Sequence, residues 1–401
     1  MSATFDVSRV RASYPALSDG HAYLDGAAGT QVPRAVIDAI AAAYQAGIGN
    51  IGGAFAASGR SDAIVAACRQ AVADLVGGVA DGVIFGPSMT ALTYRLSSAL
   101  AKGWAPGDEI VLSRLDHDAN IRPWVQAAER AGVVVRWAEV DVATGELPAA
   151  QYLDLVTSRT KLVAVTAASN VLGTRPDVAA IAGHAHAAGA LCYVDGVHAT
   201  PHMPVDMAAL GADFYATSAY KWAGPHVAAV AADPALLETL RPDKLKPSSD
   251  EVPHRFERGT LPFADLAGVT AAADHLGALA GPASGSRRER LLASMAAVED
   301  YEMTLFARLL DGLSAMSHVT VYGKAARRAP TAFFTISGMA PRAVAEHLAS
   351  RGVNAWNGDN YAYELCGVLG LRPAGAVRAG LVHYNDESDV DRLLSGVAEL
   401  G

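Results

Sequence analysis

Between about residues 60 and 230, the chain alternates short apolar runs, rich in β-branched and aromatic residues, with segments of helical periodicity. The runs span residues 82–86, 109–116, 133–141, 161–169, 191–198 and 214–220. Between several of them, sequences such as WVQAAERAG carry apolar residues three or four positions apart and end on glycine, which is typical of a helix. Strands buried on both faces and joined by helices predict a mainly parallel α/β sheet, with ligands at the carboxyl ends of the strands.

After residue 265 the pattern changes. A helical stretch pauses at GPASGS and resumes from about 286 to 314, and three strand candidates follow: HVTVYG, TAFFTISG and AVRAGLVHYN. This order predicts a smaller α+β domain at the C-terminus, and 401 residues suffice for two domains. We expect an N-terminal segment (1–20) packed with the small domain, a large domain over 21–264 and a small domain over 265–401.

Composition excludes several classes of partner. A net charge of −9 argues against nucleic acid, which requires a cationic face, and no apolar run reaches the length of a membrane span. The first residues lack the basic-then-apolar order of a signal peptide, so we expect a cytoplasmic protein. Cys68, Cys192 and Cys366 are scattered without metal-ligand spacing, so we expect neither a metal site nor a disulfide framework.

Two polar residues fall where predicted strands end. Asp195 lies at the end of one strand, in LCYVDGVH, and Lys221 follows FYATSAY. Taken alone, such an aspartate caps a turn, and a lysine after an apolar strand extends its amine to the surface. Together they fit an aldehyde cofactor, which needs a lysine amine to condense with and a buried carboxylate beside its pyridine nitrogen.

Several ordered motifs resemble the class V aminotransferases, and within them the cysteine desulfurase and selenocysteine lyase group. The most specific are SNVLGT (169–174), VDGVHATPH (194–202), SAYKWAGP (218–225) and FERGT (256–260). The similarity extends from YLDGAAGTQVP (23–33) to VRAGLVHYNDESDVDRLL (377–394). It implies PLP fold type I, the aspartate aminotransferase-like fold, and an enzyme that uses pyridoxal 5′-phosphate (PLP) to act on an amino acid.

The resemblance assigns roles around the cofactor ring. Lys221 matches the Schiff-base lysine, and Asp195 matches the partner of the pyridine nitrogen. His117, in LDHDAN, matches a histidine that stacks on the ring and can shuttle protons. Asn170 matches an asparagine near the phenolic oxygen. His198 stands where the family usually has glutamine near that oxygen, and an imidazole there can donate or accept. Lys221 and His117 are the expected catalytic residues.

A phosphate group binds well to backbone amides at the start of a helix, with a hydroxyl beside them. GPSMTAL (86–92) offers such a start, because a strand ends, a Gly-Pro turn follows and a helix opens. The family has two adjacent small hydroxyl residues here. This chain has Ser88 and Met89, with Thr90 next, so the second hydroxyl contact is in question. By resemblance, Ser218 is another phosphate ligand, and Tyr220, in place of the usual histidine, can still reach the phosphate.

Three further positions concern the partner subunit and the substrate. Gly259 and Thr260 resemble the pair that contacts the phosphate of the neighbouring subunit, which implies a homodimer with shared active sites. Arg378 matches the arginine that binds the substrate's α-carboxylate, a role that suits the planar guanidinium. Read alone, Arg378 would be a surface strand residue. The resemblance also places Ala28 among the substrate contacts.

The similarity to desulfurases fails at one position. Those enzymes need a nucleophilic thiol on a mobile loop shortly before the carboxylate-binding arginine, where this chain reads AWNGDNYAYEL (355–365). Aligned on the glycine, Tyr361 takes the place of that cysteine. Cys366 follows five residues later in a segment with helical apolar spacing, where a buried thiol would have a raised pKa and poor access to the substrate.

Removal of the α-proton by Lys221 can still lead to β-elimination, transamination or racemisation. We expect β-elimination from cysteine or a cysteine S-conjugate, that is, a C–S lyase, with Tyr361, Asn357 and Trp356 contacting the leaving group. Desulfuration through Cys366, a class V aminotransferase or epimerase activity, and a non-catalytic binding protein are the alternatives. Loss of the lysine would indicate the last of these, and the lysine is present.

Overall fold

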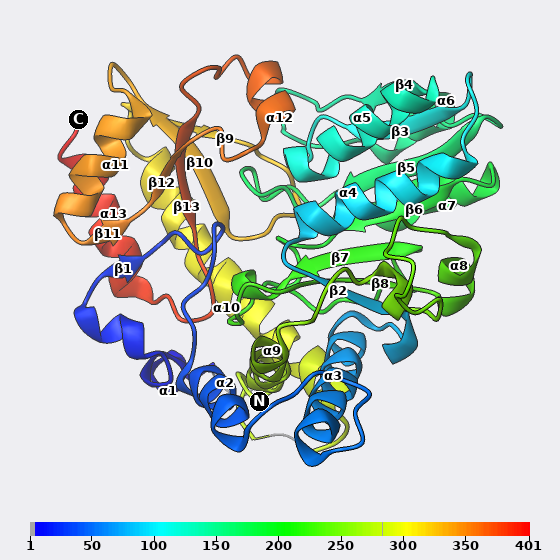
Figure 1. Ribbon diagram of the computed structural model, residues 1–401. Helices are drawn as coiled ribbons and strands as arrows, with labels where there is room; N and C mark the ends of the chain where they lie inside the picture. The colour runs from blue at the N-terminus through cyan, green and yellow to red at the C-terminus, as the bar shows by residue number, and fades with distance from the viewer. Residues whose placement is uncertain (1–4, 283) are drawn as a thin grey trace.

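The computed structural model describes residues 5–282 and 284–401. Its larger sheet has seven strands in the order β2-β8-β7-β6-β5-β3-β4, and all run parallel except β8, which is antiparallel to both neighbours (Figure 1). This arrangement confirms the predicted, mainly parallel α/β sheet. The strands are β2 (Val83–Gly86), β3 (Glu109–Ser113), β4 (Val134–Ala138), β5 (Thr160–Thr166), β6 (Leu191–Asp195), β7 (Phe214–Ser218) and β8 (Ala228–Ala232).

Alternate side chains of these strands enter two different cores. In β5, Leu162 and Ala164 join the cluster under α4 and α5, whereas Val163 and Val165 join the cluster on the opposite face. A period of two is what a strand covered on both sides requires. The helices of the large part of the chain are α2 (Arg34–Ala46), α3 (Ala56–Val76), α4 (Met89–Leu100), α5 (Arg122–Ala131), α6 (Tyr152–Leu155), α7 (Val178–Ala187), α8 (Pro234–Thr239) and α9 (Phe263–Leu276).

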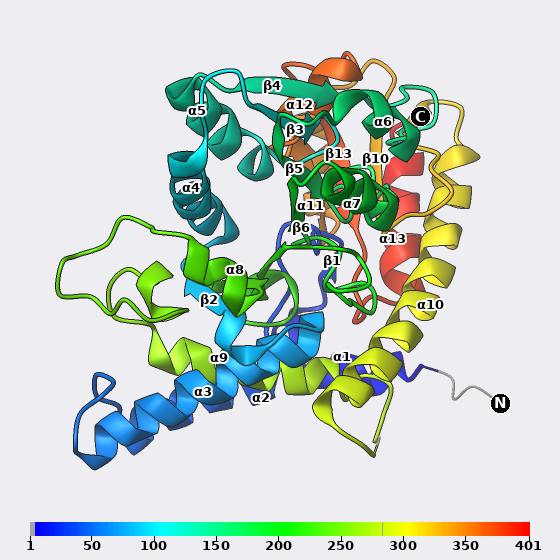
Figure 2. The same cartoon turned by 90° about the vertical axis from the view of Figure 1, so that its right-hand side faces the viewer.

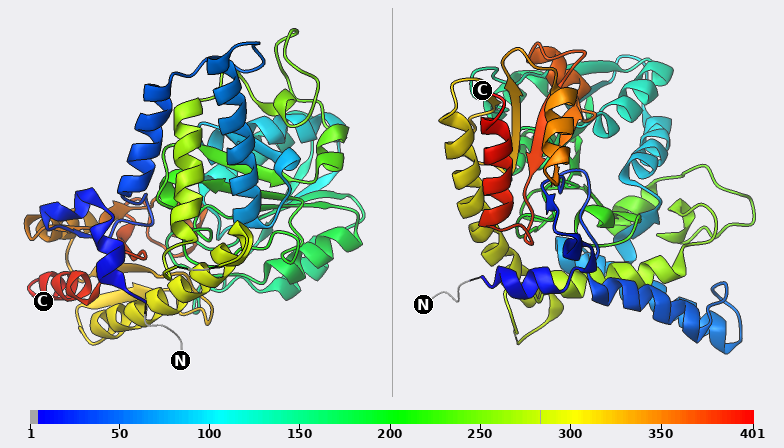
Figure 3. Two further views of the ribbon diagram at one scale, coloured as in Figure 1. Left: turned by 90° about the horizontal axis from the view of Figure 1, so that it is seen from below. Right: turned by 90° about the vertical axis from the view of Figure 1, so that its left-hand side faces the viewer.

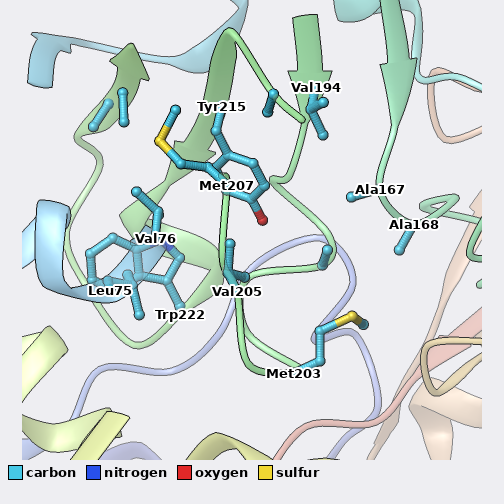
Figure 4. Packing of buried hydrophobic residues seen from close by; sticks show 14 of the residues in the cluster. Leu75, Val76, Ala167, Ala168, Val194, Met203, Val205, Met207, Tyr215 and Trp222 are labelled. Carbon is cyan, nitrogen blue, oxygen red and sulfur yellow. The ribbon is translucent and has the colours of Figure 1, made fainter. Parts of the chain in front are cut away.

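Helices α2, α9 and α3 lie side by side below the large sheet (Figure 3). Figure 4 shows part of the core above them, where the end of α3, with Leu75 and Val76, lies near Trp222, and Tyr215 of β7 lies beside Met207. The connection between α2 and α3 projects from the rest of the chain (Figure 2).

The C-terminal part holds a separate antiparallel sheet in the order β12-β13-β10-β9. Its core, which includes Leu309, Phe334 and Val377, lies between this sheet and its helices. A parallel pair, β1 with β11, adds to this region. The elements are β1 (Ala22–Tyr23), α10 (Arg287–Ser314), β9 (Val319–Tyr322), β10 (Thr331–Ile336), α11 (Pro341–Ser350), β11 (Val353–Asn354), β12 (Trp356–Gly358), α12 (Tyr363–Val368), β13 (Ala376–Gly380) and α13 (Glu387–Ala398).

The N-terminal segment, with α1 (Val7–Ala12), contacts the C-terminal helix. Arg11 pairs with Asp386 at 3.2 Å and with Asp389 at 2.7 Å. Residues 1–4 of the predicted N-terminal segment, and residue 283 in the predicted pause after α9, lie outside the described residues. The division at residues 20 and 264 stays a prediction. Helix α9 packs mainly on α2 and α3, which belong to the large part of the chain.

The six predicted strands are present, and the three C-terminal strand candidates become β9, β10 and β13. Strand β8, whose sequence is AAVAA, was not predicted, because alanine is a weak strand former. Strands β1, β11 and β12 were not predicted either, because they are only two or three residues long. Across residues 5–282 and 284–401, no helix has both the length and the apolar character that crossing a bilayer requires.

Candidate active site

The carboxyl ends of the parallel strands surround a cavity. It lies where β5, β6 and β7 end and where α4 begins, the edge at which ligands of such sheets bind. Most predicted cofactor contacts line it. The lining residues are Ser88, Met89, Thr90, His117, Ala119, Thr166, Ala168, Asn170, Asp195, Val197, His198, Ser218, Tyr220 and Lys221.

The first turn of α4 closes one end of this cavity. Ser88 caps the helix and accepts a hydrogen bond from the Ala91 amide at 3.1 Å, while the Met89 amide approaches the Ser218 hydroxyl oxygen at 3.4 Å. The helix runs for 12 residues, so its N-terminal amides and dipole favour an anion. Met89 is buried and has no hydroxyl group. The next residue, Thr90, is exposed at the cavity wall and carries a hydroxyl.

Asp195 and Lys221 are both buried in the cavity wall. Asp195 ends β6 and accepts a hydrogen bond from the Val197 amide at 2.9 Å, and burial raises its pKa to about 6. Lys221 ends the 3-10 turn η6 (Ala219–Lys221) after β7. Burial, together with the positive charge of Arg378, lowers the pKa of the Lys221 amine to about 8. A substantial fraction of the amine is therefore neutral in mildly alkaline solution, as a nucleophile or base requires.

His117 caps the 3-10 turn η4 (Asp118–Asn120), and its Nδ1 accepts a hydrogen bond from the Ala119 amide at 3.0 Å. The proton of a neutral imidazole must then lie on Nε2. Burial, with the charges of Lys221 and Arg378, lowers the pKa of His117 to about 3. His117 is therefore a neutral donor through Nε2 at physiological pH.

Two buried polar atoms near the cavity lack protein partners. The Asn170 amide donates to the Asn360 carbonyl at 2.8 Å, and His198 Nε2 shares a hydrogen bond with the Thr331 hydroxyl at 2.9 Å. Among residues 5–282 and 284–401, nothing bonds to Asn170 Oδ1 or His198 Nδ1. Buried groups of this kind usually have a partner, so these two atoms are available to a ligand of the cavity.

A second cavity adjoins the first and shares His117, Asn170, Tyr220 and Lys221 with it. Arg378 of β13 lines its wall, is buried, and donates to the Asn170 carbonyl at 3.1 Å. The four predicted substrate contacts all line this cavity. Its remaining lining residues are Ala27, Ala28, Trp356, Asn357, Gly358, Asp359, Asn360 and Tyr361. Asn360, which the sequence analysis did not single out, could have been suspected from the polar turn GDNY.

Two predicted residues, Gly259 and Thr260, are placed differently from the rest. Gly259 and Thr260 are exposed, and neither lines the two cavities of its own chain. Tyr220 lines both cavities, with its ring stacked on His226 at a centroid distance of 5.0 Å. Cys366 is fully buried in α12 and lines neither cavity.

A model of the family described as aminotransferase class-V matches residues 22–393. The chain belongs to the class V aminotransferase family. It is 37% identical over 399 residues to an uncharacterized protein of Mycobacterium tuberculosis, covering 99% of this chain and 100% of that protein. It is 32% identical over 418 residues to a cysteine desulfurase of Yersinia pestis, covering 99% and 98%.

The structure resembles that of the cysteine desulfurase CsdA of Escherichia coli, with a TM-score of 0.87 and 28% identity over 99% of this chain and 98% of that one. This likeness confirms PLP fold type I for this enzyme. The family depends on PLP, and the residues present fit that cofactor. The cavity brings together an amine with a lowered pKa, a buried carboxylate, a helix N-terminus for a phosphate, and unpartnered polar atoms on Asn170 and His198.

Proposed function

We propose that this PLP enzyme is a C–S lyase, which removes a sulfur-linked substituent from the β-carbon of cysteine or a cysteine S-conjugate. The observation that carries the proposal is the placement of Cys366. Its sulfur is buried on α12 and lies 3.9 Å from the Asp359 carbonyl oxygen, and burial raises its pKa to about 12. A thiol that is neutral and enclosed cannot attack a substrate sulfur. Tyr361, and no thiol, faces the substrate cavity at this turn.

The lining of the first cavity supports a set of proposed cofactor contacts. Asp195 would hold the pyridine nitrogen, Lys221 would attach the cofactor, and the start of α4 with Ser88 and Ser218 would bind the phosphate. His117 would lie on the ring, with Asn170 and His198 near the phenolic oxygen. When bound, PLP supplies an electron sink that stabilises the charge left by removal of the α-proton.

The chain's own groups would then act in the following order. Arg378 binds the substrate's α-carboxylate, and Asn170, whose carbonyl accepts from Arg378, fixes the guanidinium. The Lys221 amine takes the α-proton, and the C–S bond breaks with its electron pair moving to sulfur. The departing thiolate takes up the proton that Lys221 removed, and the neutral His117 donates a hydrogen bond from Nε2 to the sulfur. The net reaction converts a cysteine S-conjugate and water into pyruvate, ammonia and a thiol.

Cys366→Ala separates this proposal from desulfuration. We expect the variant to lose about 1 kcal/mol of unfolding free energy, because a buried sulfur is removed, and to keep its rate of pyruvate formation. Cys68→Ala removes an equally buried thiol from α3 and is the matched control. The products formed from cysteine are quantified alongside the rates. Stoichiometric alanine, together with a Cys366-bound persulfide in the mass spectrum, would overturn the lyase proposal.

We also propose that the enzyme is a homodimer with shared active sites. Gly259 and Thr260 lie outside their own chain's cavities, which suits a contact with the phosphate in a neighbouring subunit. The projecting α2–α3 region supports the same proposal (Figure 2), since it exposes Tyr44 and Phe55 by more than half of their surface. Exposed apolar groups that gather on one projection favour an interface.

Mixed dimers test the shared sites. Lys221→Ala and Thr260→Arg chains are each expected to be nearly inactive, because one lacks the amine and the other places a bulky cation at the expected partner phosphate. After the two are unfolded and refolded together, some hybrid dimers should regain one intact site. A mixture with no more activity than its components, or a demonstrable monomer that retains PLP with full affinity, would contradict shared sites.

A further inference from the structure

The ring of Tyr361 lies against the imidazole of His117. The ring centroids are 5.3 Å apart and the planes are inclined by 25°, a stacked arrangement. His117 lines both cavities, whereas Tyr361 lines only the substrate cavity. Tyr361 therefore contacts the imidazole from the substrate side. Their sequence positions are remote, so the contact joins the large sheet to the C-terminal part.

Backbone hydrogen bonds hold this contact in place. The Tyr361 carbonyl accepts from the Asp118 amide at 2.8 Å, directly beside His117, and the Tyr361 amide donates to the Asp359 carboxylate at 3.0 Å. The carbonyl of Asn360 accepts from the Asn170 side chain at 2.8 Å. The turn is thus tied to Asn170 of the site and to the residue that follows His117.

The turn is also strained. Asn360 and Tyr361 have φ values of 51° and 60°, in the left-handed region. For tyrosine this conformation costs roughly 1–2 kcal/mol. Strain of this kind persists only where neighbouring groups impose it, and it gathers at functional sites.

An ion-pair cluster fastens the adjoining helix α12 to the large sheet. The Glu364 carboxylate lies 3.0 Å from Arg114 and 3.0 Å from Arg122, and Arg122 also lies 2.8 Å from Asp118. Glu364 is only 15% exposed, so solvent screens these pairs incompletely. The cluster joins the residue after His117 to the third residue after Tyr361, and so fixes both ends of the stacking contact.

Core packing does not explain the position of Tyr361, because its surface is 71% exposed. A large aromatic group is left in the open, on a strained backbone, against one imidazole. We propose that Tyr361 is a positioning residue. Through its stacking contact, it fixes the position and orientation of the His117 ring and shields the ring from water. The inference rests on the proposed cofactor role of His117, but it holds for elimination and desulfuration alike.

The charges around His117 give the direction of the expected effect. Lys221 faces it from the turn after β7, Arg378 faces it from β13, and the neighbouring Asp118 is paired with Arg122. Burial and the two cations lower the pKa of His117 to about 3, so wild-type His117 stays neutral at pH 5–7. Water that enters after loss of the Tyr361 ring solvates the imidazolium. The pKa then rises toward the ordinary value of about 6.5.

The test uses the PLP-loaded enzyme without substrate, so that its outcome does not depend on the reaction catalysed. Histidine resonances are followed by NMR from pH 5 to 8, with His117→Gln identifying the His117 signal. In wild type and Tyr361→Phe, which keeps the stacked ring, the His117 signal should not titrate. In Tyr361→Ala it should titrate with a midpoint above about pH 5. The visible absorption of the bound cofactor should acquire the same pH dependence.

Glu364→Gln tests the contribution of the ion-pair cluster separately. It keeps the side-chain shape, removes the charge that joins Arg114 and Arg122, and should move the His117 titration in the same direction as Tyr361→Ala, by a smaller amount. Thermal melting shows whether each variant is folded. A His117 signal that stays silent in a folded Tyr361→Ala enzyme would overturn the proposal. A Tyr361→Phe enzyme that titrates like Tyr361→Ala would do the same, because the stacked ring would then have no role.

Discussion

Lys221→Ala is expected to lower turnover by about 10⁴-fold or more and to abolish the visible absorption of the lysine-bound cofactor. A positioned general base alone contributes on the order of 10²- to 10⁴-fold, and this amine is also the proposed attachment point of the cofactor. The site tunes it for both tasks, because burial and Arg378 lower its pKa to about 8. The measurements are the absorption spectrum and pyruvate formation from a cysteine S-conjugate.

Lys324→Ala serves as the control, because Lys324 is exposed and lines neither active-site cavity. It should leave the spectrum and the rate unchanged. A small primary amine added to the Lys221→Ala enzyme should restore part of the activity, since it can enter the space that the side chain leaves. A Lys221→Ala enzyme with the native spectrum and rate would show that Lys221 neither attaches the cofactor nor acts as the base.

The sequence was most informative where a single local pattern decided the structure. The mostly apolar runs of β5, β6 and β7 predicted buried parallel strands, and the carboxyl ends of such strands meet at one edge of a sheet. Asp195 and Lys221 therefore come together although 26 positions separate them in the sequence. The alanine-rich strand β8 was missed because burial between β2 and β7, and not its own propensity, makes it a strand.

The loop from Trp356 to Tyr361 was predictable only in part. Its lining of the substrate cavity followed from the resemblance, but its conformation depends on distant partners. Tyr361 is held by the Asp118 amide and the His117 ring, and Asn360 is held by Asn170. None of these contacts has a sequence signature, because each joins segments more than 180 positions apart.

The fully buried state of Cys366 was expected from helical spacing, and the structure confirms it.

The placement of Gly259 and Thr260 shows another limit. Motif resemblance suggested phosphate contacts, and within one chain these residues are exposed and line neither cavity. In the proposed homodimer, the phosphate that they contact would lie in the other subunit. A sequence pattern identifies residues that share a site, but it does not say which subunit supplies them.

Arg378→Lys is expected to lower kcat/KM by about 30- to 1000-fold, the equivalent of about 2–4 kcal/mol, chiefly through KM. One arm of the guanidinium already donates to the Asn170 carbonyl, and the rest is available for the substrate carboxylate. A lysine ammonium has no fixed fork and cannot serve both partners in the same geometry. The spectrum of the bound cofactor should not change, because Arg378 lines only the substrate cavity.

The loss of kcat/KM in Arg378→Lys, relative to wild type, should also grow as the pH rises. Burial lowers the pKa of Arg378 to about 10, so the guanidinium stays charged throughout the range from pH 6 to 9. A lysine begins from a lower pKa, and the same burial lowers it further, so its positive charge is lost as the pH rises through that range.

Arg328→Lys is the matched control. Arg328 is buried with a pKa also lowered to about 10, lines neither active-site cavity, and its replacement should change stability with little effect on kcat/KM. Arg378→Lys kinetics within about threefold of wild type across this pH range would show that Arg378 does not bind the substrate carboxylate.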